Sequence, residues 1–192
     1  MKTWLHSLAA LAALFASTLA TAQDAKPTIV LVHGAFAESS SWNGVIGLLE
    51  KDGYPVVAAA NPLRGVRTDA DAVASVLSSI ATPIVLVGHS YGGSVISEAA
   101  VGHANVRALV FVAAFAPDVG ETAAGLSGKF PGSTLGPALA DPVPIAGGGK
   151  DLYIRKDTFW KQFAADVKTS DAKLMAAPQR PIAEAALNEA ST

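Results

Sequence analysis

The sequence has no cysteine among its 192 residues. This absence excludes disulfides, thiol nucleophiles and cysteine-ligated metal ions. Charged residues are also scarce, at 16% of the chain, against about 25% in an average domain. The 14 basic and 16 acidic residues give a net charge of −2 without a basic cluster, so no nucleic-acid binding is expected. The four histidines form no cluster with metal-ligand spacing, so the sequence predicts no metal site, and no cofactor is expected.

The N-terminus carries the pattern of a secretory signal. Lys2 precedes an apolar run over residues 8–16, and Ala20-Thr21-Ala22 forms an A-x-A cleavage site. The pattern predicts a signal peptide over residues 1–22 that is removed before Gln23. An uncleaved membrane anchor is the alternative, but the apolar run is shorter than the roughly 20 residues a span needs. We therefore expect a secreted or periplasmic protein with no membrane attachment after cleavage.

The remaining chain is long enough for one globular domain and alternates strand-like with helix-like segments. Short runs rich in β-branched residues predict buried strands; they cover residues 28–32, 55–59, 83–87 and 106–115. Apolar residues at helical spacing predict helices between them; these cover residues 39–52, 69–80 and 90–103. The alternation predicts a parallel sheet flanked by helices, with right-handed crossovers, in a core over residues 27–118.

The composition changes after Asp118. Residues 119–149 are rich in Gly, Pro, Ala and Ser, and helical patterns follow, with no further strand pattern. The expected helices cover residues 157–166, 170–177 and 182–190. We expect residues 119–192 to form a partial helical cap over the sheet.

The motif that carries chemistry is Gly88-His89-Ser90-Tyr91-Gly92, between a predicted strand and a predicted helix. A serine at such a sharp turn is held with its hydroxyl above the sheet, and glycines flank it where a β-carbon would collide. The pattern predicts that Ser90 is a nucleophile that attacks an acyl carbon.

A second motif, His33-Gly34-Ala35-Phe36, follows the first predicted strand. Parallel strands end at the same edge of a sheet, so this loop should face Ser90. The N–H of Ala35, with that of Phe36 as a further candidate, and the N–H of Tyr91 are the expected oxyanion hole. We expect Phe36 and Tyr91 to contact the substrate, a small or medium apolar ester, although aromatic side chains in this region could simply pack the cap against the core.

These motifs resemble the α/β-hydrolase superfamily, in particular its short esterase, methylesterase and hydroxynitrile-lyase-like members. The resemblance rests on three segments: residues 31–36, 86–93 and 109–118. It implies an α/β-hydrolase fold, Ser90 as the nucleophile, and the N–H groups of Ala35 and Tyr91 as the oxyanion hole. An ester hydrolase and a related lyase both remain open.

The sequence departs from that family in one respect. Such hydrolases order their triad Ser, acid, His along the chain, but His103 is the only histidine after Ser90. Neither it nor His33 or His89 is expected to be the base. Asp118 is expected to hold the loop into the cap, with the alternative that it is the triad acid, a position that some family members use. The resemblance therefore implies a fragment, with the last strands and the triad His missing and the strand 106–115 left as an exposed sheet edge. The alternative is an inactive protein that binds a ligand or a partner; the oligomeric state is left open.

Overall fold

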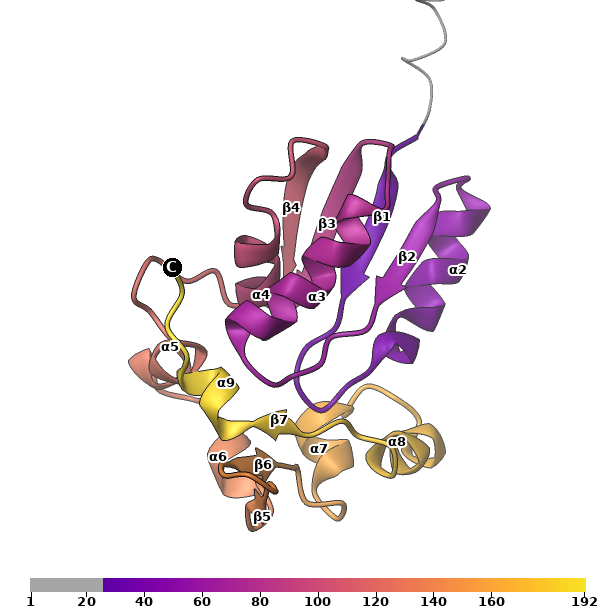
Figure 1. Cartoon of the computed structure of the whole chain (residues 1–192). Coiled ribbons are helices and arrows are strands. Elements are labelled where there is room, and N and C mark those ends of the chain that lie inside the picture. Colours follow the sequence, from indigo (N-terminus) through magenta and orange to yellow (C-terminus); the bar gives the residue numbers. More distant parts are fainter. Residues whose placement is uncertain (1–25) are drawn as a thin grey trace, which may run out of the picture.

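A computed structural model describes residues 26–192, and the predicted signal peptide lies outside these residues. Four parallel strands form the central sheet in the order β2-β1-β3-β4 (Figure 1). Their bounds are Thr28–Val32 for β1, Val56–Ala59 for β2, Ile84–His89 for β3 and Val106–Val112 for β4. All four lie at positions predicted from β-branched runs, although β4 ends three residues early. The fold is that of an α/β protein with a parallel sheet flanked by helices, as expected.

Helices cover the two faces of the sheet unequally. The helices α3 (Val66–Ser78) and α4 (Gly92–Ala99) pack on one face, where their apolar stripes join the large core cluster with β1 and β3. On the other face, the 3-10 helix η1 (Ser39–Trp42) and α2 (Asn43–Lys51) contribute to a smaller cluster around Ile29, Leu31 and Val87. The predicted helix over residues 39–52 is thus divided, and Val45 and Leu48 on its apolar repeat are 40% and 66% exposed.

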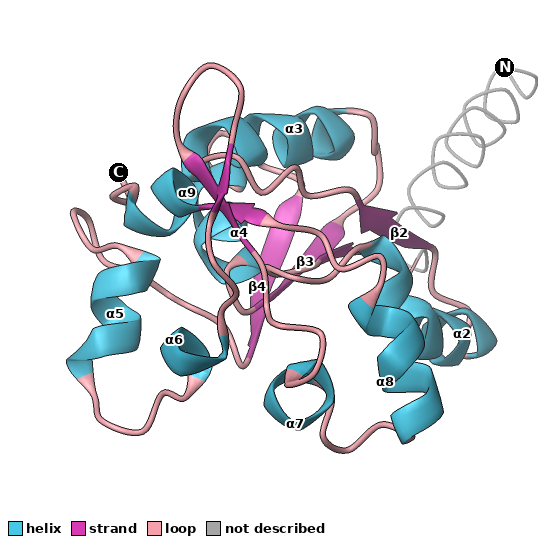
Figure 2. Ribbon diagram, turned by 90° about the horizontal axis from the view of Figure 1, so that it is seen from below, coloured by secondary structure: helices cyan, strands magenta, loops and turns pink. Residues whose placement is uncertain are grey.

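Residues 119–192 form a layer across the carboxyl ends of the strands (Figures 1 and 2). This layer, the cap, contains five short helices: α5 (Ala123–Lys129), α6 (Leu135–Ala138), α7 (Phe159–Phe163), α8 (Thr169–Ala176) and α9 (Glu184–Asn188). The expectation of a cap without strands is wrong. Three short antiparallel strands occur there: β5 (Val143–Pro144), β6 (Lys150–Leu152) and β7 (Ile182–Ala183). Segments of two or three residues are too short to show a period of two.

The strand β4 lies at the edge of the described sheet, as predicted. Leu109, Val110, Phe111 and Val112 are 37–41% exposed, whereas Leu86 on the neighbouring strand β3 is fully buried. Within residues 26–192, no strand pairs with the outer side of β4. In the same part of the chain, no helix is both long and apolar enough to span a bilayer.

Candidate active site

Ser90 sits on a tight turn between β3 and α4, and its φ is +53°. This left-handed conformation is costly for a residue with a side chain, and it persists because close packing fixes the turn. A Cβ at Gly88 would lie 2.6 Å from the carbonyl oxygen of Gly92, and a Cβ at Gly92 would lie 2.7 Å from that of Val32. The glycines therefore allow β1, β3 and α4 to approach closely, as their spacing predicted.

The Ser90 side chain lines a cavity of about 420 Å³ between the sheet edge and the cap. His89, Trp42 and Gln162 line the same cavity. The carbonyl oxygen of Ser90 accepts hydrogen bonds from the N–H groups of Gly93 and Phe115, at 3.0 and 3.1 Å. These two hydrogen bonds hold the backbone of the turn from two sides.

The loop after β1 faces the same turn. A Cβ at Gly34 would lie 2.7 Å from the Cβ of Ser90, so only glycine permits this approach. Among the described residues, the N–H groups of Ala35 and Tyr91 have no hydrogen-bond acceptor. Phe36, in contrast, donates its N–H to the carbonyl oxygen of Arg180 at 3.0 Å. The cap therefore occupies the Phe36 N–H, and of the candidate oxyanion donors only Ala35 and Tyr91 keep theirs free.

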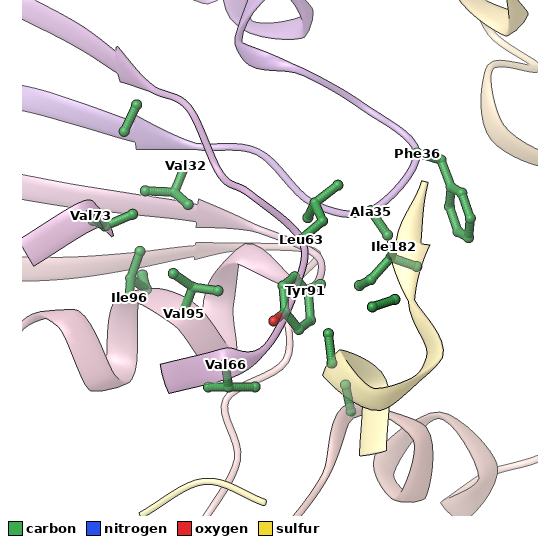
Figure 3. Packing of buried hydrophobic residues seen from close by; sticks show 14 of the residues in the cluster. Val32, Ala35, Phe36, Leu63, Val66, Val73, Tyr91, Val95, Ile96 and Ile182 are labelled. Carbon is green, nitrogen blue, oxygen red and sulfur yellow. The ribbon is translucent and has the colours of Figure 1, made fainter. Parts of the chain in front are cut away.

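The Tyr91 side chain does not line the cavity beside Ser90. It is fully buried in the core, among Leu63, Val66 and Val95 (Figure 3). Its hydroxyl donates to Asp69 Oδ2 at 2.9 Å. The expectation that the Tyr91 side chain contacts the substrate is therefore wrong, because this side chain is fully buried in the core. Only its N–H remains available to the site.

Asp69 is a buried carboxylate that the sequence analysis missed. It is fully buried on α3, and besides Tyr91 it accepts the N–H of Arg64 with Oδ1 at 3.0 Å and Oδ2 at 3.2 Å. Burial raises the pKa of Asp69, while these hydrogen bonds oppose the rise. Burial and the neighbouring Asp69 charge raise the pKa of Tyr91. The sequence feature that could have identified Asp69 is its position on the apolar face of the helix predicted over residues 69–80.

His33 is fully buried and both of its ring nitrogens are engaged. Nε2 accepts the N–H of Asn61 at 3.1 Å, so Nδ1 carries the proton and donates it to the carbonyl oxygen of Gly34 at 2.9 Å. Burial lowers the pKa of His33 and keeps the ring neutral. The side chain orders the loop, and it has no free nitrogen to act as a base.

His89 and His103 are the other two histidines of the described residues, and only His89 borders the cavity beside Ser90. His89 borders the Ser90 cavity and packs edge-to-face on Trp42, with ring centroids 6.3 Å apart, and burial lowers its pKa. Within residues 26–192, no hydrogen bond joins the Ser90 hydroxyl to a histidine. His103 follows the far end of α4, where its N–H donates to the carbonyl oxygen of Ala100.

Asp118 is exposed in the turn that leads into the cap. Its N–H donates to Glu121 Oε2 at 3.0 Å, and its carbonyl oxygen accepts the N–H of Glu121 at 3.0 Å. These bonds close the turn. The described residues contain no group of three or more His, Asp or Glu side chains able to hold a metal ion.

A second cavity, of about 750 Å³, adjoins the first under the cap. The two share Ala37, Ser41 and Phe163 in their linings. The Phe163 ring packs edge-to-face on Phe36, with centroids 6.3 Å apart, and lies 5.0 Å from the ring of Phe159. Phe36 thus lines the larger cavity rather than the one beside Ser90. Glu38 and Asp171 are the charged residues in the lining.

A match to a protein-family model identifies the family of this chain. The model of the alpha/beta hydrolase family matches residues 29–189, which is most of the chain and includes both motifs. The chain belongs to the alpha/beta hydrolase family.

Curated relatives agree with this family. An alpha/beta hydrolase of Aspergillus novofumigatus is 31% identical in an alignment 119 residues long, and the match covers 52% of this chain and 48% of the relative. A probable hydrolase of a Phoma species is 36% identical in an alignment 112 residues long, and the match covers 50% of this chain and 46% of the relative. This alpha/beta hydrolase chain thus matches about half the length of these relatives.

Solved structures share the fold at low sequence identity. Polyneuridine aldehyde esterase superposes with a TM-score of 0.68 at 20% identity, over 82% of this chain and 69% of that one. Tomato methylketone synthase I, complexed with 2-tridecanone, gives 0.69 at 22% identity, over 86% and 71%. An extracellular alpha/beta-hydrolase from a Paenibacillus species gives 0.65 at 23%, over 84% and 69%.

Proposed function

We propose that this chain carries the nucleophile and oxyanion hole of an exported serine hydrolase that acts on carboxylic esters. The observation that carries the proposal is the left-handed Ser90 at the β3–α4 turn, with its side chain in a cavity. A strained serine at a strand-to-helix turn in an alpha/beta hydrolase is the arrangement that suits nucleophilic attack. The predicted signal peptide over residues 1–22 supports export.

In the proposed reaction, Ser90 Oγ attacks the ester carbonyl carbon and forms a tetrahedral intermediate with a negatively charged oxygen. The free N–H groups of Ala35 and Tyr91 would hold that oxygen, and the loss of one such donor typically costs about 2.7–4 kcal/mol of transition-state stabilisation. Collapse of the intermediate expels the alcohol and leaves an acyl group on Ser90. Water then hydrolyses the acyl-enzyme and restores the serine.

The general base is proposed to come from polypeptide outside residues 26–192. His33 has both ring nitrogens engaged, and His89 makes no hydrogen bond to Ser90 within the described chain. The cavity beside the serine, bordered by Val112 and Ala113 at the open sheet edge, leaves room for such a group. A base at this place would remove the proton from Ser90 Oγ and later give it to the leaving alcohol.

The two adjoining cavities favour an uncharged ester with a large apolar portion. Ser90 lines the smaller cavity, and the aromatic side chains of Phe36, Phe159 and Phe163 line the larger one. Glu38 and Asp171 would repel a substrate that carries a carboxylate in its apolar part. An apolar pocket with few polar groups suits an uncharged ester with a large apolar portion.

Fluorophosphonate labelling with chemical rescue tests this proposal. We expect slow labelling of Ser90 in the 192-residue chain, because no base assists it, and acceleration by added imidazole, which the open cavity can admit. Ser90→Ala should abolish the labelling. The matched variant Ser97→Ala, on the helix α4 that follows this turn, should keep it, since the Ser97 hydroxyl bonds only to the carbonyl oxygen of Gly93. Fast labelling without imidazole would contradict the external base, and labelling that survives Ser90→Ala would contradict the nucleophile.

A second candidate function is non-catalytic ligand binding by the same cavities. The observation that favours it is the absence of a base hydrogen-bonded to Ser90 in residues 26–192. Binding of an apolar ester that is unchanged by Ser90→Ala, without imidazole-dependent labelling, would support this alternative.

A further inference from the structure

Arg64 joins the cap to the core through two different parts of the same residue. Its Nη2 donates to the carbonyl oxygen of Pro181 at 2.8 Å, and its Nη1 forms an ion pair with Asp151 Oδ1 at 2.7 Å. Both partners belong to the cap, since Asp151 lies in β6 and Pro181 directly precedes β7. The N–H of Arg64, in contrast, donates to the buried carboxylate of Asp69. One residue therefore connects two groups of the cap to a carboxylate of the core.

The loop that carries Arg64 has a strained backbone next to this residue. Leu63 is fully buried, and its φ is +63°. A side chain other than glycine keeps such a left-handed conformation only where its surroundings hold it there. The carbonyl oxygen of Leu63 accepts the N–H of Ala183 in β7 at 3.0 Å. The contacts of Leu63 and Arg64 with the cap therefore oppose relaxation of this loop.

Asp69 extends the connection to the turn that carries Ser90. Tyr91 donates its hydroxyl to Asp69 Oδ2 at 2.9 Å, and the same oxygen accepts the N–H of Arg64 at 3.2 Å. Burial raises the pKa of Asp69, and the N–H and positive charge of Arg64 are among the groups that oppose this rise. The N–H of Tyr91 is one of the two free donors of the proposed oxyanion hole. Two hydrogen bonds thus link Arg64 to the residue that supplies this donor.

We propose that Arg64 is a positioning residue, which acts through Asp69 and the Tyr91 ring to hold the Tyr91 N–H in place for the oxyanion of the substrate. Arg64 lines neither of the two cavities near Ser90, so it does not act by binding the ester. Loss of its guanidinium would let the strained Leu63 relax and displace the N–H that Asp69 accepts. The catalytic part of this inference rests on the proposed function, whereas the link between the cap and Tyr91 can be measured without it.

A second ion pair between core and cap provides the matched control. Arg67 Nε on α3 lies 2.9 Å from Glu189 Oε1, but within residues 26–192 no side-chain hydrogen bond joins Arg67 to Asp69 or Tyr91. After burial and Asp69, the charge of Glu189 also contributes to the raised pKa of Tyr91. A purely electrostatic effect of losing an arginine should therefore appear in Arg67→Met as well as in Arg64→Met.

Fluorine NMR of protein that contains 3-fluorotyrosine measures the link between the cap and Tyr91. The chain has three tyrosines, and Tyr91→Phe identifies the Tyr91 signal. We expect this signal to shift in Arg64→Met and to shift much less in Arg67→Met. Asp151→Ala alters the cap alone and should shift the signal in the same direction as Arg64→Met. Far-UV circular dichroism checks that each variant folds.

Imidazole-assisted fluorophosphonate labelling of Ser90 measures the catalytic consequence. The maximal labelling rate should fall about tenfold in Arg64→Met, which is less than the roughly hundredfold that a 1 Å misplacement can cost. The probe concentration that gives half the maximal rate should not change, because Arg64 lines neither cavity. Arg67→Met should keep both values within about twofold, since an exposed ion pair contributes little.

Three results would overturn the proposal. Equal shifts of the Tyr91 signal in Arg64→Met and Arg67→Met would indicate an effect of charge alone. A signal that shifts in Arg64→Met but not in Asp151→Ala would show that the cap does not position Tyr91. A shifted signal with an unchanged maximal labelling rate would refute the positioning role. A parent chain without imidazole-assisted labelling would instead contradict the proposed function, and the Tyr91 signal would still support or refute the link to the cap.

Discussion

Gly88 and Gly47 provide a pair of Gly→Ala substitutions whose effects on stability should have opposite signs. A Cβ at Gly88 would lie 2.6 Å from the carbonyl oxygen of Gly92, 2.8 Å from the carbonyl carbon of that residue and 2.9 Å from the nitrogen of Gly93. All three atoms belong to the backbone of the turn after Ser90 and the first turn of α4, so no side chain can move aside. Relief would require β3 and α4 to separate.

Overpacking of this kind costs about 1–3 kcal/mol, and we expect Gly88→Ala to fall in the upper half of that range. In a domain of this size, 1 kcal/mol corresponds to a change in Tm of roughly 2–4 °C. Gly47 is exposed in the middle of α2, and a Cβ there would meet nothing within 4 Å. Gly47→Ala should therefore stabilise the protein, by roughly 0.5–1 kcal/mol, because alanine loses less entropy in a helix.

Urea denaturation followed by circular dichroism measures both free energies of unfolding. The two variants add the same methyl group, so a general effect of side-chain size cancels between them. Equal stability of Gly88→Ala and the parent chain would refute the argument that the close contact of β3 with α4 sets the conformation of Ser90. Destabilisation by Gly47→Ala would refute the assignment of α2 as an exposed helix.

Two further predictions concern the buried pair Asp69 and Tyr91. Tyr91→Phe removes a donor from a fully buried carboxylate and should lower the free energy of unfolding by about 1–3 kcal/mol, measured by urea denaturation; an unchanged value would contradict the hydrogen bond. Because burial raises the pKa of Asp69, the folded state holds its proton more tightly than the unfolded state does. The stabilising contribution of protonated Asp69 is complete below the pKa of the unfolded chain and is lost as the pH rises through the folded pKa. Urea midpoints measured across this range should therefore fall less steeply with pH in Asp69→Asn than in the parent chain, and parallel profiles would contradict the raised pKa.

The central sheet could be predicted because β-branched runs and glycine-flanked turns are local signals. The strand–turn–helix around Ser90 is fixed by Gly88 and Gly92, whose neighbours in space are also neighbours along the chain or lie on the adjacent strand. The edge position of β4 followed from the lack of a further strand pattern. These features depend on patterns that a single sequence contains.

Other features depend on contacts between distant segments. The N–H of Phe36 bonds to the carbonyl oxygen of Arg180, and no local pattern connects residues so far apart in the sequence. The direction of the Tyr91 ring depends on the hydrogen bond from its hydroxyl to Asp69. The Asp69 carboxylate is tolerated in the core because the N–H of Arg64 donates to it. The strand β7 exists because the N–H of Ala183 reaches the carbonyl oxygen of Leu63 and because β6 lies beside it.

The hydrogen bond between Phe36 and Arg180 has a consequence for changes in the length of the cap. It ties the loop before η1 to the short segment just ahead of β7, so insertions there would move the backbone on which the proposed oxyanion site is built. Residues 126–134 make no comparable tie to that loop, and most of them are exposed. Lengthening or replacing this outer part of the cap would therefore leave that backbone in place, whereas a change of length around Arg180 would shift it.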